Sequence, residues 1–103
     1  MARSDGEPPE PRDNYGYVCD LHTPKPNPWL ALIPPERFVG HYVKRAFPVR
    51  ASTNHEHMWV YVEGVNAAGA LVGRLDNDPV LDCGLTCGDR VVVDVRQIEA
   101  VVP

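Results

Sequence analysis

The stretch His55-Glu-His-Met-Trp-Val-Tyr-Val-Glu-Gly64 begins the part of the chain that decides its fold. Two further runs follow it, Gly69-Ala-Leu-Val-Gly-Arg-Leu-Asp-Asn-Asp-Pro79 and Leu85-Thr-Cys-Gly-Asp-Arg-Val-Val-Val-Asp-Val95. Their apolar segments have the length of strands, and they are separated by Gly, Asn, Asp and Pro, which favour turns. The region from His55 to Ile98 therefore predicts a small antiparallel β unit.

The first of these runs alternates in character, because successive side chains of a strand point to opposite faces. One face is apolar and belongs in a core: Met58, Val60 and Val62. The opposite face is rich in aromatic rings: His57, Trp59 and Tyr61. A helix together with Trp29 covers this second face, or else it is an exposed binding surface.

The later runs predict two more strands and an edge. Gly73, inside the second strand, predicts a bulge or a close approach of neighbouring backbone. The third strand is expected from Arg90 to Val95, with its core side at Val91, Val93 and Val95. A last short edge strand is expected around Gln97-Ile98 and Val101-Val102.

The best helix candidate runs from Pro34 to Phe47. Proline is accepted in the first helical turn, Glu36 suits the positive end of the helix dipole, and Pro48 stops the helix. An apolar stripe recurs at helical spacing: Phe38, Val39, Tyr42, Val43, Ala46 and Phe47. The predicted fold class is therefore α+β, with one amphipathic helix packed on a bent antiparallel sheet or small open barrel of about four to five strands.

The segments before this helix are poor core material. Residues 1–14 are polar and rich in proline, so a disordered tail is expected there. Residues 15–33 are expected to form a proline-rich covering arm, because alternate prolines favour an extended path. Trp29-Leu-Ala-Leu-Ile33 is expected to anchor this arm, and residues 34–103 make a single α+β domain.

Composition excludes several classes of function. The net charge of -4 over 103 residues argues against a nucleic-acid binder, because such proteins neutralise phosphates with Lys and Arg. No apolar run approaches membrane-spanning length and no signal peptide is apparent, so we expect a soluble cytoplasmic protein without membrane contact. No glycine-rich phosphate loop precedes a helix, and we expect no cofactor.

The order of motifs resembles a known bacterial family. Glu56-x-x-Trp59-Val60, Gly73-x-Leu75-x-Asn77-x-Pro79, Gly88-Asp89-x-Val91 and Ile98 resemble the YegJ-like domains of unknown function, over the C-terminal half of the chain. The family pattern closes with Ile-x-Asp-Trp, whereas Ile98 is followed here by Glu99, Ala100 and Val101. The resemblance implies a compact α+β module and a protein-binding or immunity-like role, with no established reaction.

Four residues could bind a metal or carry catalysis. His55 and His57 point the same way on a strand, and Cys83 and Cys87 could complete a tetrahedral site. The C-x3-C spacing departs from usual structural zinc spacings, and a buried Cys most often acts as a small hydrophobe. Nucleophilic catalysis would combine Cys83 or Cys87 with His57 and Glu56, but no local motif places them together.

We therefore predict a non-enzymatic binding module for a protein partner, immunity-like or regulatory in role. Its expected contact residues surround the aromatic strand face, where large rings lie beside a charge: Glu56, Trp59, Tyr61 and Asn77. One alternative is a small hydrolase-like or metal-dependent enzyme that uses His55 and His57 with the cysteines. The other is a purely architectural domain, which a wholly buried Trp59 would favour.

Overall fold

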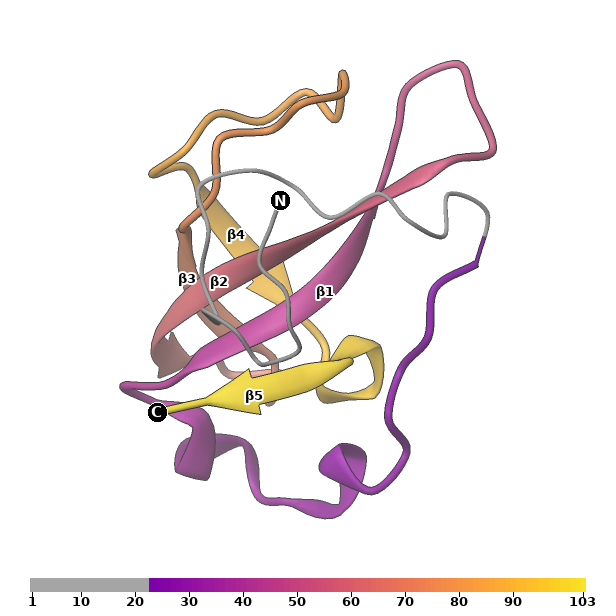
Figure 1. Ribbon diagram of the computed structural model, residues 1–103. Helices are drawn as coiled ribbons and strands as arrows, with labels where there is room; N and C mark the ends of the chain where they lie inside the picture. Colours follow the sequence, from indigo (N-terminus) through magenta and orange to yellow (C-terminus); the bar gives the residue numbers. More distant parts are fainter. Residues whose placement is uncertain (1–22) are drawn as a thin grey trace.

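The computed structural model of the chain describes residues 23–103. Within that range the chain forms five strands and three short 3-10 helices. The strands are β1 (Tyr42–Pro48), β2 (His55–Val65), β3 (Leu71–Leu75), β4 (Arg90–Val93) and β5 (Ala100–Val102). The helices are η1 (Leu30–Leu32), η2 (Pro35–Phe38) and η3 (Val95–Gln97). The strands make one open antiparallel sheet in the order β4-β3-β2-β1-β5 (Figure 1).

The sheet curves strongly. Arg45 of β1 projects from the same face as Met58, its partner on β2. Its Nη1 atom nevertheless donates to the carbonyl oxygen of Val92 on β4 at 3.3 Å, although β2 and β3 lie between the two strands in the sheet. One side chain can span this gap only because the sheet bends around its inner face.

The predicted helix from Pro34 to Phe47 is wrong, and with it the α+β fold class. The helical part ends with η2, and Gly40 then adopts a φ of 86°, a left-handed conformation that ends a helix. From Tyr42 the chain is a strand that pairs with β2 on one side and β5 on the other. The described part of the chain is mostly β, because aromatic and β-branched side chains and two partner strands favour extended backbone here.

The core lies on the inner face of the sheet. The apolar face predicted for β2 is confirmed, since Met58, Val60 and Val62 are all fully buried. Further core members come from the other elements: Phe38, Val43, Phe47, Leu71, Leu75, Val91, Val93 and Ile98. The core is therefore built mainly from strands, with Phe38 contributed by η2.

Gly73 marks both a bulge and a close backbone approach, as predicted. Val62 pairs with Gly73 and Gly64 pairs with Val72, so Glu63 is one extra residue on β2. A Cβ atom added at Gly73 would lie 2.1 Å from the carbonyl oxygen of Tyr61. Only glycine fits this position, and the bulge fixes which β2 residues face inward beyond it.

The described end of the arm runs beside the start of β5. The Asn27 N–H donates to the Ile98 carbonyl at 2.8 Å, and the Lys25 N–H donates to Glu99 Oε2 at 2.7 Å. Trp29 does not anchor the arm, because it is 75% exposed; Leu30 and Ile33 pack against the core instead. The predictions for residues 1–14 and 15–22 lie outside the described residues.

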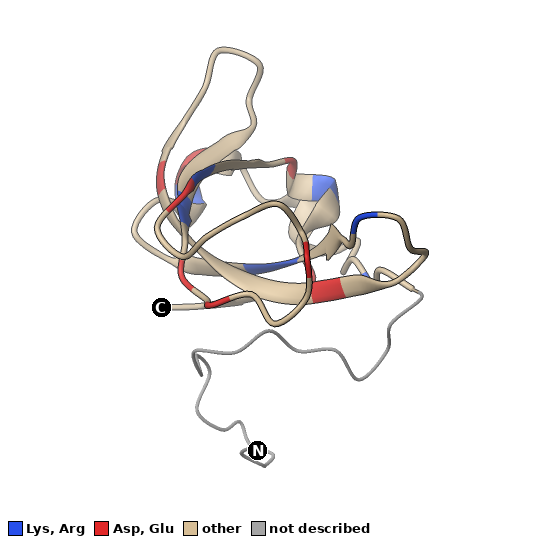
Figure 2. Ribbon diagram, turned by 90° about the horizontal axis from the view of Figure 1, so that it is seen from above, with Lys and Arg blue, Asp and Glu red and all other residues tan. Residues whose placement is uncertain are grey.

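Charge is distributed without a single dominant sign. Acidic and basic residues are both scattered over the described ribbon (Figure 2). No helix within residues 23–103 has the length and apolar character needed to cross a membrane.

Candidate functional site

β2 carries most of the residues singled out by the sequence, divided between its two faces. Glu56 continues the inner face that holds Met58, Val60 and Val62. The outer face bears His55, His57, Trp59 and Tyr61. The predicted contact residues therefore do not form one surface.

Glu56 is a buried carboxylate with well-defined partners. It is fully inaccessible to solvent, and its Oε2 and Oε1 atoms accept hydrogen bonds from the N–H groups of Val80 and Leu81 at 2.8 and 2.9 Å. The Cys83 thiol lies 3.7 Å from Oε1. A carboxylate that accepts two backbone N–H groups fixes the position of the segment that provides them. Glu56 therefore holds the loop 76–89 against β2.

Asn77 holds the start of the same loop. Its side chain is fully buried, and Oδ1 accepts a short hydrogen bond from the Trp59 N–H. The Asp76 N–H donates to the Trp59 carbonyl at 2.9 Å, so both backbone polar groups of Trp59 are satisfied by this loop. Glu56 and Asn77 thus position Trp59 and the loop, and their own side chains are not available at the surface.

The end of the loop is fixed by the Gly88-Asp89 motif. Gly88 has a φ of 94°, and its N–H donates to the Leu75 carbonyl at 2.8 Å. Asp89 Oδ2 accepts from the Thr86 N–H at 2.9 Å, and the Asp89 carbonyl accepts from the Leu75 N–H. Most motif residues behind the family resemblance therefore hold this loop on the sheet.

The outer face of β2 presents rings supported by their neighbours on β1. Trp59 is half-buried and Tyr61 is 37% exposed. The Tyr42 ring centroid lies 5.1 Å from that of Tyr61, and the Lys44 ammonium lies 5.5 Å from the Trp59 ring centroid. Such tilted ring pairs and cation–π contacts hold side chains in fixed orientations. We call these four residues, Tyr42, Lys44, Trp59 and Tyr61, the aromatic face.

His57 makes a buried hydrogen-bonded contact that the sequence did not suggest. Its Nδ1 lies 2.7 Å from Glu99 Oε1, and both side chains are only 5% exposed. His57 pairs in register with Ala46 on β1, whose small side chain lets the imidazole reach across β1 towards β5. Glu99 occupies the unspecified position of the closing pattern Ile-x-Asp-Trp, and the chain departs from that pattern at Ala100 and Val101, so the pattern gave no signal for this pair.

The candidate metal and catalytic residues are not brought together. His57 lies on the outer face with Glu99, whereas Cys83 contacts Glu56 on the inner side. Burial and the charge of Glu56 raise the pKa of the Cys83 thiol to about 11, so it is protonated at neutral pH. Burial also raises the pKa of Cys87.

His55 has one buried ring nitrogen for which the structure shows no partner among the described residues. Its Nδ1 is buried and makes no hydrogen bond. Nevertheless, no three His, Cys, Asp or Glu side chains within residues 23–103 lie together as a metal-binding group.

A pocket at one end of the sheet was not anticipated. It lies between η2 and β5 and has a volume of about 360 Å³. Its residues gave no sequence signal, because the segment around Arg37 and His41 was expected to be one face of a helix. Gly40, which lies between Arg37 and His41, was the one residue that could have indicated that the helix ends there.

Comparison with known proteins places the chain in a family. No curated protein and no solved structure matches it. Residues 33–101 match the family model of DUF2314, which is described as an uncharacterized protein conserved in bacteria. This range begins well before the C-terminal half that carried the resemblance, and it includes η2, β1 to β4, the loop 76–89 and β5 as far as Val101. The chain therefore belongs to the DUF2314 family of uncharacterized bacterial proteins.

Proposed function

We propose that this protein is a non-enzymatic module that binds a protein partner through the aromatic face. The supporting observation is that Trp59 and Tyr61 lie on the face of β2 that is not the core, with Tyr61 more than one third exposed. Tyrosine and tryptophan are common anchors of protein interfaces, because they present a large rigid ring and a polar group together.

The fixed geometry of the face supports the same proposal. Trp59 is held through its backbone by Asp76 and Asn77, and its ring by Lys44. Side chains that are already ordered lose little conformational entropy on binding, which favours affinity. In this proposal Trp59 and Tyr61 contact the partner, while Glu56 and Asn77 position them from inside. An immunity-like or regulatory role, and the YegJ-like assignment, are further parts of the proposal.

The alternatives receive less support. An enzyme that uses the histidines and cysteines would need a thiolate near an imidazole. The raised pKa of Cys83 argues against that arrangement, as does its contact with Glu56 on the inner side while His57 contacts Glu99. An architectural domain was expected to bury Trp59 wholly, whereas Trp59 keeps part of its surface exposed.

The test begins with affinity capture of a partner from bacterial extract by the full chain, followed by purification of that partner. Its dissociation constant is then measured by calorimetry for the wild type, Tyr61→Ala and Trp59→Ala. We expect each ring truncation to weaken binding about tenfold or more, as for interface anchors. Unfolding curves establish that each variant remains folded.

Val80→Ala provides the matched control. Val80 is 56% exposed on the loop 76–89 and also loses apolar surface on substitution, but it lies outside the aromatic face. Its affinity should stay within about threefold of the wild type. Equal weakening by Val80→Ala and Tyr61→Ala, or no weakening by either ring variant, would rule out the aromatic face as the contact surface.

A further inference from the structure

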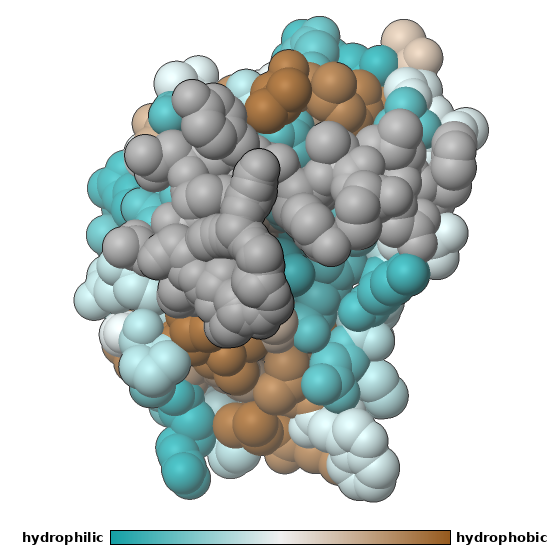
Figure 3. Space-filling view, viewed as in Figure 1, coloured by the Kyte–Doolittle hydropathy of each residue, from teal (hydrophilic) through white to brown (hydrophobic). Residues whose placement is uncertain are grey.

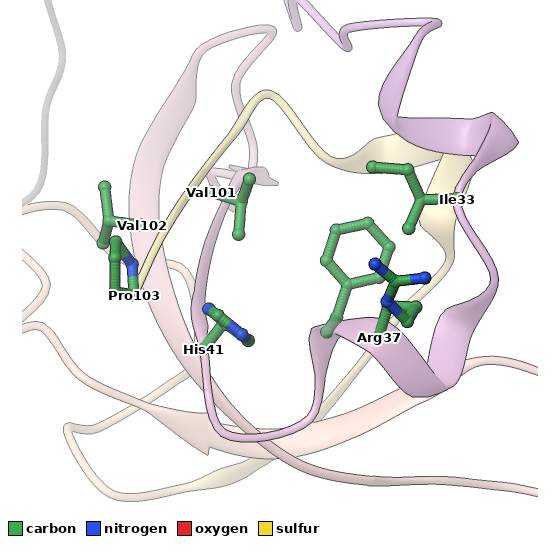
Figure 4. A pocket seen from close by; sticks show the side chains of 7 residues that line it. Ile33, Arg37, His41, Val101, Val102 and Pro103 are labelled. Atoms are coloured by element: carbon green, nitrogen blue, oxygen red, sulfur yellow. The ribbon is translucent and has the colours of Figure 1, made fainter.

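The pocket at the end of the sheet is separate from the aromatic face. Its lining residues come from the segments around η1 and η2 and from β5 with the residue that follows it: Ile33, Arg37, Phe38, His41, Val101, Val102 and Pro103. Figure 4 shows Arg37 and Ile33 on one side, Val102 and Pro103 on the other, and His41 and Val101 between them. In Figure 3 apolar surface gathers beside β5, towards η1 and η2. The lining of the pocket is likewise mostly apolar, with Arg37 and His41 as its polar side chains.

Two nitrogen-rich side chains give the pocket its chemistry. Arg37 is exposed and His41 is half-buried, and neither side chain takes part in a hydrogen bond or ion pair with the described residues. No Asp or Glu is among the described residues that line the space. The guanidinium group is a planar fork of donors that matches a carboxylate, and it stays charged throughout the physiological range.

The backbone that carries these side chains is held firmly. The Gly40 N–H donates to the Val62 carbonyl at 2.9 Å, and the Val62 N–H donates to the His41 carbonyl at 3.0 Å. Phe38 is only 2% exposed and belongs to the core. Arg37 and His41 are thus attached on either side of a turn whose backbone is fixed, so a ligand would meet their Cα positions already in place.

We propose that this pocket binds a small organic carboxylate with an apolar body. The carboxylate would accept hydrogen bonds from Arg37 and His41, while the apolar body would contact Ile33, Phe38 and Val101. A volume of about 360 Å³ falls near the lower end of ligand pockets, which indicates a small molecule. A single guanidinium beside apolar walls suits one carboxylate better than a doubly charged phosphate, which would need more donors.

The test uses phenylacetate and phenylacetamide, which have the same shape and differ in charge. Each is titrated into the full chain while backbone amide shifts are followed by NMR. We expect phenylacetate to shift the signals of residues 37–41 and 101–102 in a saturable way and phenylacetamide to bind about tenfold more weakly. Equal binding of the two compounds, or no saturable shift with phenylacetate, would overturn the proposal.

Two variants and a control locate the interaction. Arg37→Gln should weaken phenylacetate binding about tenfold and leave phenylacetamide unchanged, because only the charged hydrogen bonds are lost. Val101→Trp should weaken both compounds by filling the space that their ring would occupy. Arg96→Gln removes an exposed arginine that lies outside the pocket lining and should change neither affinity. An Arg37→Gln variant that binds phenylacetate like the wild type would show that Arg37 does not hold the carboxylate.

Discussion

The polar side chains on the two faces of β2 find their hydrogen-bond partners in different ways. On the inner face Glu56 is fully buried among apolar residues, and its carboxylate is occupied by two backbone N–H groups of the loop 76–89. On the outer face His57 is buried against Glu99, and exposure then increases along the strand to Tyr61. On the inner face, the side chains from Glu56 to Val62 are all buried. On the outer face, exposure rises from the buried His57 to the exposed Tyr61.

This difference separates residues that maintain the fold from residues that can meet a ligand. A buried carboxylate is tolerated only when its hydrogen bonds are complete, so Glu56 depends on the loop and the loop on Glu56. The rings of Trp59 and Tyr61, by contrast, contact Lys44 and Tyr42 on β1, so truncating either ring removes no acceptor from a buried N–H group. Stability should therefore respond strongly to changes on the inner face, and binding to changes on the outer one.

Glu56→Ala should give the largest loss of stability. The substitution leaves the N–H groups of Val80 and Leu81 without their acceptor and removes buried volume next to Cys83. We expect the free energy of unfolding to fall by about 3 kcal/mol or more, measured by urea denaturation.

Glu63→Ala is the matched control on the same strand. Glu63 is exposed and its carboxylate lies 3.4 Å from Arg74, an interaction that solvent screens. Its loss should cost less than about 1 kcal/mol. Equal losses of unfolding free energy in the two glutamate variants would contradict the expectation that the buried Glu56 stabilises the fold more than the exposed Glu63.

Gly73→Ala should have the next largest effect, because it disturbs the bulge that sets which residues face inward. The new Cβ would lie 2.1 Å from the backbone oxygen of Tyr61, so one strand must move. A cost of about 2 to 3 kcal/mol is expected in thermal or urea unfolding. Gly64→Ala is the control across the same bulge, where a Cβ meets nothing within 4 Å; a similar cost there would contradict this steric account.

The strands after His55 could be predicted because their signals are local, except that β4 ends at Val93 and Val95 begins η3 instead of extending the strand. Alternation placed Met58, Val60 and Val62 in the core, and Gly73 indicated the bulge. The segment from Pro34 to Phe47 failed because its apolar residues fit a helical stripe as well as a strand. The strand was selected by pairing with β2 and β5, which are distant in sequence, and by the turn at Gly40.

The candidate site could be predicted only in part. The aromatic residues were found from their pattern, and the same alternation places Glu56 on the opposite face with Met58, although Glu56 was grouped with Trp59 and Tyr61. Sequence alone could not show that the Glu56 carboxylate is buried in a network with the loop. The pocket with Arg37 and His41 depends on the turn at Gly40 and on β5. Both arrangements rest on contacts between segments far apart in the chain.

The pair of His57 and Glu99 should make a moderate contribution to stability. Single and double substitutions to Gln in a double-mutant cycle should yield a coupling energy of about 1 to 2 kcal/mol, since both side chains are nearly inaccessible and their closest atoms are 2.7 Å apart. The free energies come from urea denaturation of the four proteins. A coupling energy near zero would mean that the buried end of the outer face is held by packing alone.

Asp94 offers an exposed counterpart to Glu56 and should give the smallest effect. It caps η3 by accepting the Arg96 N–H at 2.9 Å, and hydrogen bonds from the Arg96 side chain and backbone lower its pKa from 3.8 to about 2. Since the folded-state pKa is depressed, its contribution is present above the ordinary pKa and is lost as pH falls towards about 2.

The Asp94 side chain is 40% exposed, so screening keeps the cost of Asp94→Ala at about 0.5 to 1 kcal/mol near neutral pH. In urea denaturation this difference from the wild type should shrink between about pH 4 and about pH 2. A loss as large as that of Glu56→Ala would show that burial is not what distinguishes these two carboxylates, because both accept hydrogen bonds from backbone N–H groups.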